Sequence, residues 1–214
     1  MCAMTPHGQP LRIAILASGE GTTLQAVLDA CASGVLNARV VVVISNRRDS
    51  GALRRAEAAK INGVYLSSRT HSEPAALDQA MAGYLTEAKV DLVVLAGFLK
   101  KIGPCVLAAF GERMLNTHPA LLPKFGGEGM YGRHIHEAVL AAGEKETGVT
   151  VHRVDGDYDR GAVVAQLKVP VQKGDTVDSL ATRVQAAERL FLVETLQQFA
   201  VSHTVNSEIE QIKP

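Results

Sequence analysis

Four short and continuous apolar runs constrain the fold of this chain most strongly. They are Leu11 to Ala17, Arg39 to Ser45, Val90 to Ala96 and the run that begins at Met114. Runs of this length without polar alternation are typical of strands that are buried on both faces of a parallel sheet. Apolar residues at helical spacing between the runs indicate the crossover helices that such a sheet requires. We therefore expect one α/β domain, doubly wound and Rossmann-like, with a mostly parallel sheet and helices on both faces.

The C-terminal part of the chain departs from this alternation. Two further strand patterns, at Val149 to Val154 and at Ala162 to Val171, are joined by the short segment Asp155 to Gly161. A connection this short favours an antiparallel strand in the otherwise parallel sheet. The joining segment contains three aspartates, but it lacks the twelve-residue pattern and closing glutamate of a calcium loop. We therefore expect no calcium site there.

The expected domain covers residues 11–200 and ends with a long amphipathic helix capped by Asp175 or Thr176. Residues 1–10 have neither the charged nor the apolar region of a signal peptide, and we expect a flexible leader. Residues 201–214 are expected to form a tail that is either an appended strand or disordered.

Composition excludes several classes of protein. The 214 residues carry 22 basic and 22 acidic side chains, and a zero formal net charge argues against a surface that binds nucleic acid. No apolar run approaches the roughly 20 residues that span a bilayer. The three cysteines, Cys2, Cys31 and Cys105, are scattered and are best explained as reduced thiols. We expect a cytoplasmic protein that binds neither nucleic acid nor a membrane.

The first candidate site follows the first strand. The segment Ser18 to Thr23 contains Gly19 and Gly21 and leads into a helix, an arrangement that places backbone N–H groups and a helix N-terminus against a phosphate. Leu24 stands where a dinucleotide fingerprint would have its third glycine, so that fingerprint is not present. A mononucleotide-type phosphate site and a plain tight turn both remain open.

The second candidate site is the end of the strand that begins at Met114. In extended backbone Asn116 and His118 share one face, and Pro119 disfavours helical backbone at His118. An amide donor beside an imidazole suits a carbonyl oxygen that becomes an oxyanion. The alternative is a strand end whose asparagine and histidine only satisfy a turn.

Strand ends in this fold meet in one cleft, so the turn at Gly19, the segment Gly97 to Ile102 and the Asn116–His118 pair should converge. Three other features have open interpretations. Arg47 and Arg48 could hold an anion or form a solvated loop pair, and the glycine-rich loop from Phe125 to Arg133 could cover a ligand. His134 and His136 lack a nearby acidic or cysteine partner, so we expect no metal site.

Four segments of the chain resemble the folate-dependent formyltransferase family, and within it phosphoribosylglycinamide formyltransferase, the glycinamide ribonucleotide transformylase of purine synthesis. The segments are ILASGEGTTLQA, VLAGFLKKIGP, LNTHPALLPKF and GVTVHRVDGDYDRGAVVAQ. They occur in the order and spacing of the family, and the resemblance extends from about Arg12 to Ala200.

The resemblance implies transfer of the formyl group of 10-formyltetrahydrofolate to the glycine amine of the ribonucleotide, through a tetrahedral intermediate and without a metal. It implies small-molecule substrates, while the sequence leaves open whether the protein is a monomer or a homodimer. Asp159 would favour the charged form of the histidine. The implied site residues are Asn116, His118 and Asp159 for catalysis, Gly21, Thr22 and Thr23 for the substrate phosphate, and Leu99, Lys100, Lys101, Ile102 and Asn116 for the folate.

Two departures from the family and several rival interpretations remain. Pro74 stands where some relatives carry an arginine that contacts the folate, and the loop from Gly126 to Arg133 is longer than in the shortest members. Methionyl-tRNA formyltransferase, formyltetrahydrofolate hydrolase and sugar-amine formyltransferases share this chemistry. A nucleotide-binding regulatory module without catalysis is the alternative outside enzymes.

Overall fold

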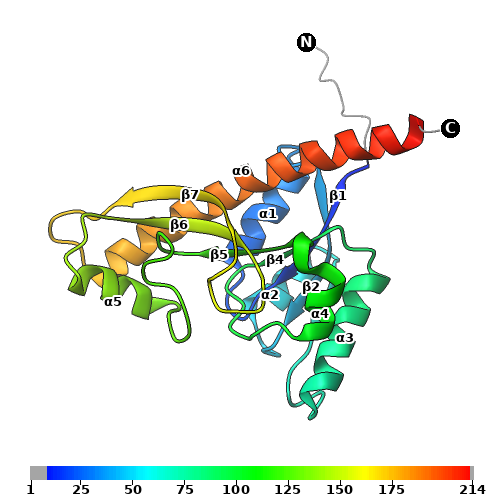
Figure 1. Ribbon diagram of the computed structural model, residues 1–214, viewed down its shortest axis with the longest axis horizontal. Helices are drawn as coiled ribbons and strands as arrows, with labels where there is room; N and C mark the ends of the chain where they lie inside the picture. Colours follow the sequence, from blue (N-terminus) through cyan, green and yellow to red (C-terminus); the bar gives the residue numbers. More distant parts are fainter. Residues whose placement is uncertain (1–8, 213–214) are drawn as a thin grey trace.

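The apolar runs of the sequence form the strands of one seven-stranded sheet (Figure 1). The computed structural model describes residues 9–212, with side chains as far as Val205. The strands are β1 (Leu11–Leu16), β2 (Ala38–Ser45), β3 (Asn62–Tyr65), β4 (Leu92–Leu95), β5 (Met114–His118), β6 (Glu146–Arg153) and β7 (Val163–Pro170). The helices are α1 (Thr22–Ala32), α2 (Gly51–Ala58), α3 (Pro74–Glu87), α4 (Pro104–Phe110), α5 (Arg133–Ala141) and α6 (Val177–Ile212), with a short 3-10 turn η1 (Gly111–Arg113) after α4.

The strand order is β3-β2-β1-β4-β5-β6-β7. Strands β1 to β5 pair in parallel, whereas β6 is antiparallel to both of its neighbours, β5 and β7. The chain therefore reverses once, at β6, and β7 returns to the direction of the first five strands. The expected mostly parallel sheet with an antiparallel strand near the C-terminus is confirmed.

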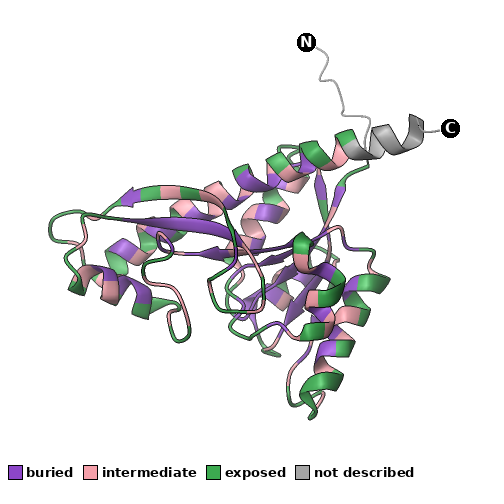
Figure 2. Cartoon of the chain, in the orientation of Figure 1, coloured by how far each residue is buried: buried purple, intermediate pink, exposed green. Residues whose placement is uncertain are grey.

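Helices cover both faces of the sheet, as the doubly wound prediction requires (Figure 2). On one face α1, α2 and α6 bury apolar side chains against β1 and β2. On the other face α3 and α4 pack against β4 and β5. A third apolar cluster joins α5 and the first half of α6 to β6 and β7. The central strands are buried on both sides, which explains why their sequences show no polar alternation.

The topological switch point lies between β1 and β4, because the chain winds outward to β2 and β3 before it returns beyond β1. Ser18 joins the two strand ends across this point. Its backbone N–H donates to the carbonyl of Gly97 at 3.0 Å, and its hydroxyl accepts from the backbone N–H of Leu99 at 2.9 Å. The same hydroxyl donates to Oδ1 of Asn46 at 2.6 Å. Ser18 thus fixes where the segments beyond β1, β2 and β4 open into a crevice.

The last helix is longer than expected. Residues 201–212 continue α6, so the expected strand or disordered tail is not found there. The sequence from Val177 to Ile212 contains neither glycine nor proline, and nothing in it terminates the helix. On this segment His203 faces Asp91, with its Nε2 3.6 Å from Oδ2 of the carboxylate. Residues 1–8 of the expected leader and residues 213–214 lie outside the described part of the chain.

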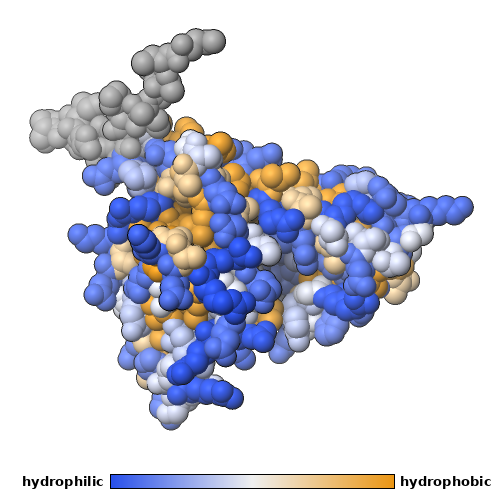
Figure 3. Space-filling view, turned by 180° about the vertical axis from the view of Figure 1, so that it is seen from behind, coloured by the Kyte–Doolittle hydropathy of each residue, from blue (hydrophilic) through white to orange (hydrophobic). Residues whose placement is uncertain are grey.

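The outer side of α6 keeps several apolar side chains at the surface. Leu190 is 69% exposed and Val201 is 65% exposed, and apolar atoms lie along this helix in Figure 3. Between residues 9 and 212, no helix is both long enough and apolar enough to cross a membrane.

Candidate active site

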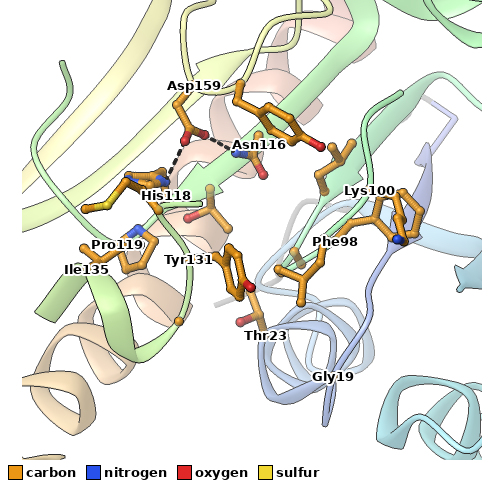
Figure 4. Close-up of a pocket in the computed structure, with 18 of the residues that line it drawn as sticks. Gly19, Thr23, Phe98, Lys100, Asn116, His118, Pro119, Tyr131, Ile135 and Asp159 are labelled. Atoms are coloured by element: carbon orange, nitrogen blue, oxygen red, sulfur yellow. Dashed lines mark hydrogen bonds and ion pairs between the residues drawn. The ribbon is translucent and has the colours of Figure 1, made fainter. Parts of the chain in front are cut away.

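The carboxyl ends of β1, β4 and β5 open into one cavity of about 720 Å³ (Figure 4). The expected convergence is found, since the cavity is lined by the turn after β1, the segment after β4 and the end of β5. All ten of the predicted site residues line it: Gly21, Thr22, Thr23, Leu99, Lys100, Lys101, Ile102, Asn116, His118 and Asp159.

The turn before α1 exposes backbone donors to the cavity. Gly21 is the N-cap of α1 and has left-handed backbone, with φ of 70°. A Cβ at this position would lie 2.7 Å from the Cα of Ala52, so only glycine fits between the turn and α2. No side chain caps the helix. The backbone N–H groups of its first turn therefore remain available to an anion, and the helix dipole favours negative charge there.

Asn116, His118 and Asp159 form one contact network at the other wall of the cavity. Alternation along β5 points Asn116 and His118 to the same side, as expected, while Asp159 reaches them from the loop between β6 and β7 (Figure 4). Asn116 Nδ2 donates to Asp159 Oδ1 at 3.3 Å. His118 Nδ1 lies 3.4 Å from Asp159 Oδ2. The carboxylate thus bridges the amide and the imidazole, and both His118 and Asp159 are at least nine-tenths buried.

The hydrogen bonds of His118 define which nitrogen carries a proton. Nε2 lies 2.8 Å from the backbone carbonyl oxygen of Phe125, which can only accept, so Nε2 is protonated. Nδ1 faces Asp159 at a distance longer than an ordinary hydrogen bond. A second proton on Nδ1 would give an imidazolium directly against the carboxylate. This geometry suits a histidine that exchanges its Nδ1 proton.

Asp159 is held in its charged form. Burial alone would raise its pKa, but the neighbouring rings of His118 and His152, the positive charge that His118 can carry and the backbone N–H of Gly127 together bring the pKa well below the ordinary value. The Gly127 N–H donates to Asp159 Oδ2 at 3.0 Å. The site therefore keeps one fixed negative charge beside His118.

His152 belongs to the same network and was not predicted. It pairs with Asn116 across the antiparallel β5–β6 ladder. Its Nδ1 donates to the carbonyl of Arg153 at 2.7 Å, so in the neutral ring Nε2 accepts the Asn116 Nδ2–H at 3.0 Å. The only signal in the sequence was an inward-facing histidine on a strand, which says nothing of its register with Asn116.

Three polar side chains from helices also line the cavity and were not assigned to it from the sequence. Gln185 and Glu188 come from α6, and His136 comes from α5. His136 is 1% exposed, and burial, followed by the charge of His118, lowers its pKa. Burial raises the pKa of Glu188 to about 7, although Thr117, Arg189 and His118 act in the opposite direction. At neutral pH this carboxyl group can donate as well as accept hydrogen bonds.

The raised pKa of Glu188 predicts a pH-dependent free energy of unfolding. The folded state binds the proton of Glu188 more tightly than the unfolded state does. The protonated group therefore makes its full contribution to the free energy of unfolding below about pH 4.5, and this contribution is lost as the pH rises through 7. Glu188→Gln should remove this loss. Without substrate, the variant should gain roughly 3 kcal/mol relative to the wild type between pH 5 and pH 8.

Urea unfolding across that pH range measures the difference. Glu194→Gln is the matched control, because Glu194 lies on the exposed side of the same helix. Parallel pH curves for the wild type and Glu188→Gln would contradict the prediction.

The segment after β4 forms the far end of the cavity. Leu99 is half-exposed, Ile102 is buried, and Lys101 Nζ lies 3.5 Å from Asp157 Oδ1. A second cavity of about 980 Å³ adjoins this end and shares Phe98, Lys100 and Lys101 with the first.

Cations line the second cavity. Its lining includes Arg47, Arg48 and Arg69 besides the shared lysines. Arg47 and Arg48, for which the sequence allowed either an anion site or a solvated loop pair, therefore face a cavity. Arg48 stacks on the ring of Tyr65, 5.4 Å from its centroid. Pro74 also lies on this wall. No cluster of three or more potential metal ligands is present among the described side chains, which end at Val205.

The fold and the site together define the class of protein. A family model described as "Formyl transferase" matches residues 11–196, so the chain belongs to the formyl transferase family, as the four sequence segments predicted. Within that family the chain is similar to proteins named phosphoribosylglycinamide formyltransferase. The enzyme of Haemophilus influenzae is 40% identical over 177 residues, which cover 83% of this chain and 81% of that protein. The enzyme of Escherichia coli is 36% identical over 190 residues, covering 89% and 87%.

Solved structures agree with the sequence comparison. The crystal structure of glycinamide ribonucleotide transformylase 1 from Symbiobacterium toebii has a TM-score of 0.85 and 39% sequence identity to this chain. The alignment covers 92% of this chain and 90% of the other.

Proposed function

We propose that this enzyme transfers the formyl group of 10-formyltetrahydrofolate to the amine of phosphoribosylglycinamide, in purine biosynthesis. The observation that carries the proposal is the single cavity that joins an uncapped helix N-terminus to the Asn116–His118–Asp159 network. The relatives named above have this activity in their names, and the chain covers most of their length.

The phosphate of the ribonucleotide would bind at Gly21, Thr22 and Thr23, where backbone N–H groups of α1 face the cavity. The ribose would then extend toward β5, past Gln185 and Glu188 of α6. This direction brings the glycine amine to Asn116 and His118. The formyl folate would enter from the opposite end, with its pterin against the segment from Leu99 to Ile102.

The reaction needs one donor for the oxyanion and one group that moves a proton. The amine attacks the formyl carbon, a C–N bond forms, and the carbonyl oxygen gains charge in a tetrahedral intermediate. Asn116 would exchange its contact with Asp159 for this oxygen, and His118 would donate from Nδ1. As the intermediate collapses, the bond to the folate nitrogen breaks and that nitrogen takes the proton lost by the amine. Asp159 stays charged and stabilises the imidazolium.

The second cavity would bind the carboxylates of the folate tail. The guanidinium groups of Arg47 and Arg69 and the ammonium of Lys100 make no hydrogen bond or ion pair with the side chains described, those of residues 9–205. These cations lie beyond the proposed pterin segment and can compensate for the arginine that some relatives carry at Pro74. A charged tail would bind them by ion pairing that salt weakens.

Arg69→Ala should raise the KM for 10-formyltetrahydrofolate about threefold to tenfold and leave kcat nearly unchanged, because an ion pair outside the reacting centre contributes to binding alone. The control variant is Arg39→Ala, an exposed arginine on β2 that lines neither cavity. A formyl folate analogue without the glutamate tail should show no difference between Arg69→Ala and wild type. An equal loss for both folates would contradict this assignment.

Tetrahydrofolate formation, followed by absorbance with and without phosphoribosylglycinamide, tests the proposed function. The proposal predicts turnover only in the presence of the ribonucleotide. Deformylation that is indifferent to the ribonucleotide would identify a hydrolase instead. No turnover in either mixture would favour another amine acceptor or a module without catalysis.

The remaining expectations stay predictions. They are a cytoplasmic location, no binding of nucleic acid, no resident metal, and a monomeric or homodimeric state. The exposed apolar side chains of α6 are available to a second copy, and sedimentation of the purified protein would measure the state.

A further inference from the structure

The loop from Gly126 to Gly132, between β5 and α5, has a backbone path that glycine determines. We call residues 126–132 the cover loop. Gly127, Gly129 and Gly132 have φ of 103°, 84° and 56°, values that side-chain-bearing residues rarely adopt. A Cβ on Gly126 would lie 2.4 Å from a methyl group of Leu122. Residues with side chains would therefore strain or change the backbone path of the cover loop at these positions.

Both ends of the cover loop are fixed, and one of them is fixed by the catalytic network itself. His118 Nε2–H donates to the carbonyl of Phe125, and the N–H of Gly127 donates to Asp159. At the other end Arg133 begins α5 and forms ion pairs with Glu137 and with Asp178 on α6. The side chains carried between these ends are thus held in a defined place relative to the site.

Tyr131 is the side chain that the cover loop presents to the cavity. Figure 4 shows its ring on the side of Thr23 and Pro119, away from Lys100. Tyr131 is 49% exposed, and its ring packs against the ring of His134, with centroids 5.5 Å apart. Its hydroxyl makes no hydrogen bond among the described side chains of residues 9–205, and the mechanism proposed above does not use it.

The phosphate end of the cavity lacks a strong cation. Within the described part of the chain, the only lysines or arginines that line this cavity are Lys100 and Lys101, at the folate end. A phosphate at α1 must therefore be held by backbone N–H groups and by neutral side-chain donors, among which the amide of Gln185 and the hydroxyls of Thr22, Thr23 and Tyr131 line the cavity. Those N–H groups reach it from one side, and the side toward the cover loop needs another donor.

We propose that Tyr131 is a binding residue of the ribonucleotide, whose phenol hydroxyl donates a hydrogen bond to the substrate phosphate at Thr22 and Thr23. The inference rests on the proposed function and adds to it a residue that selects phosphorylated acceptors. It assigns the cover loop a role in substrate selection.

Tyr131→Phe removes only the hydroxyl and keeps the ring contact with His134. We expect the KM for phosphoribosylglycinamide to rise about tenfold, with kcat and the KM for 10-formyltetrahydrofolate nearly unchanged, since the bond contributes to binding of one substrate. Tyr84→Phe, on the exposed side of α3 and outside both cavities, is the control and should behave as wild type. An unchanged KM in Tyr131→Phe would overturn the proposal.

Calorimetry without folate separates the phosphate from the rest of the ligand. Wild type and Tyr131→Phe are titrated with phosphoribosylglycinamide and with the same compound lacking its phosphate. The proposal predicts that the variant loses about tenfold in affinity for the first compound and nothing for the second. An equal loss for both compounds would place the hydroxyl on the ribose or glycine and overturn the proposal.

These titrations also separate a failure of the proposed formyl transfer from a failure of the proposed role of Tyr131. Wild-type protein that binds the ribonucleotide but transfers no formyl group would refute the proposed function, while the comparison with Tyr131→Phe would still decide the role of the hydroxyl. Wild-type protein that binds neither compound would refute both.

Discussion

Asn116→Ala and His118→Ala should each lower kcat at least about a hundredfold. In the proposed mechanism both side chains donate to the oxygen of the tetrahedral intermediate, and loss of one such donor typically raises the barrier by roughly 3–4 kcal/mol. Because the oxygen carries this charge only as the reaction proceeds, the KM values should change much less. Steady-state kinetics with both substrates varied measures the two effects separately.

The double variant sharpens this prediction. Asn116 and His118 are bridged by the same carboxylate, so removing both should cost far less than the product of the single losses. Asn62→Ala, at an exposed position on β3, controls for loss of an amide elsewhere. Near-normal turnover in either single variant, with the fold intact by circular dichroism, would refute the proposed roles.

Asp159→Asn should lower kcat by a similar factor and also change the response of the protein to acid. The side chain keeps its size but loses the charge that stabilises the His118 imidazolium. The depressed pKa of Asp159 in the folded state means that its ionised form stabilises the fold above the ordinary value of 3.8. This contribution is lost only as the pH falls below that value toward the folded-state pKa.

Unfolding measurements should therefore show Asp159→Asn less stable than wild type by about 2 kcal/mol at pH 7, with the gap closing below about pH 3. Asp29→Asn, on the exposed side of α1, is the matched control. A gap that persists unchanged in acid would show that the charge of Asp159 does not stabilise the fold.

The sequence predicted the architecture because the physical signals were local. The valine-rich runs of β2 and β4 can only be strands covered on both faces, and strand ends in such sheets meet in one crevice. The alternation of β5 placed Asn116 and His118 on one face. Asp159 was predicted only from the resemblance to the family, because it lies in a loop 41 positions beyond His118 and its spacing does not indicate that the two residues meet.

The rest of the site depends on tertiary register that a single sequence does not encode. His152 reaches Asn116 only because β6 runs antiparallel with one particular pairing. Glu188 reads as a polar position on an amphipathic helix, and its burial against the cavity follows from how α6 crosses β5 and β6. The tail was mispredicted because β-branched residues such as Val201 and Val205 weaken the helical signal, while no residue actually ends the helix.

Direct analysis of the reaction product is the measurement that tests the central claim most directly. Purified enzyme is given 10-formyltetrahydrofolate with an isotopic label in its formyl group, together with phosphoribosylglycinamide, and the products are resolved by mass spectrometry. The account predicts that the label appears on the glycine amine of the ribonucleotide, in amounts equal to the tetrahydrofolate released. Label recovered as free formate, with the ribonucleotide unchanged, would contradict it.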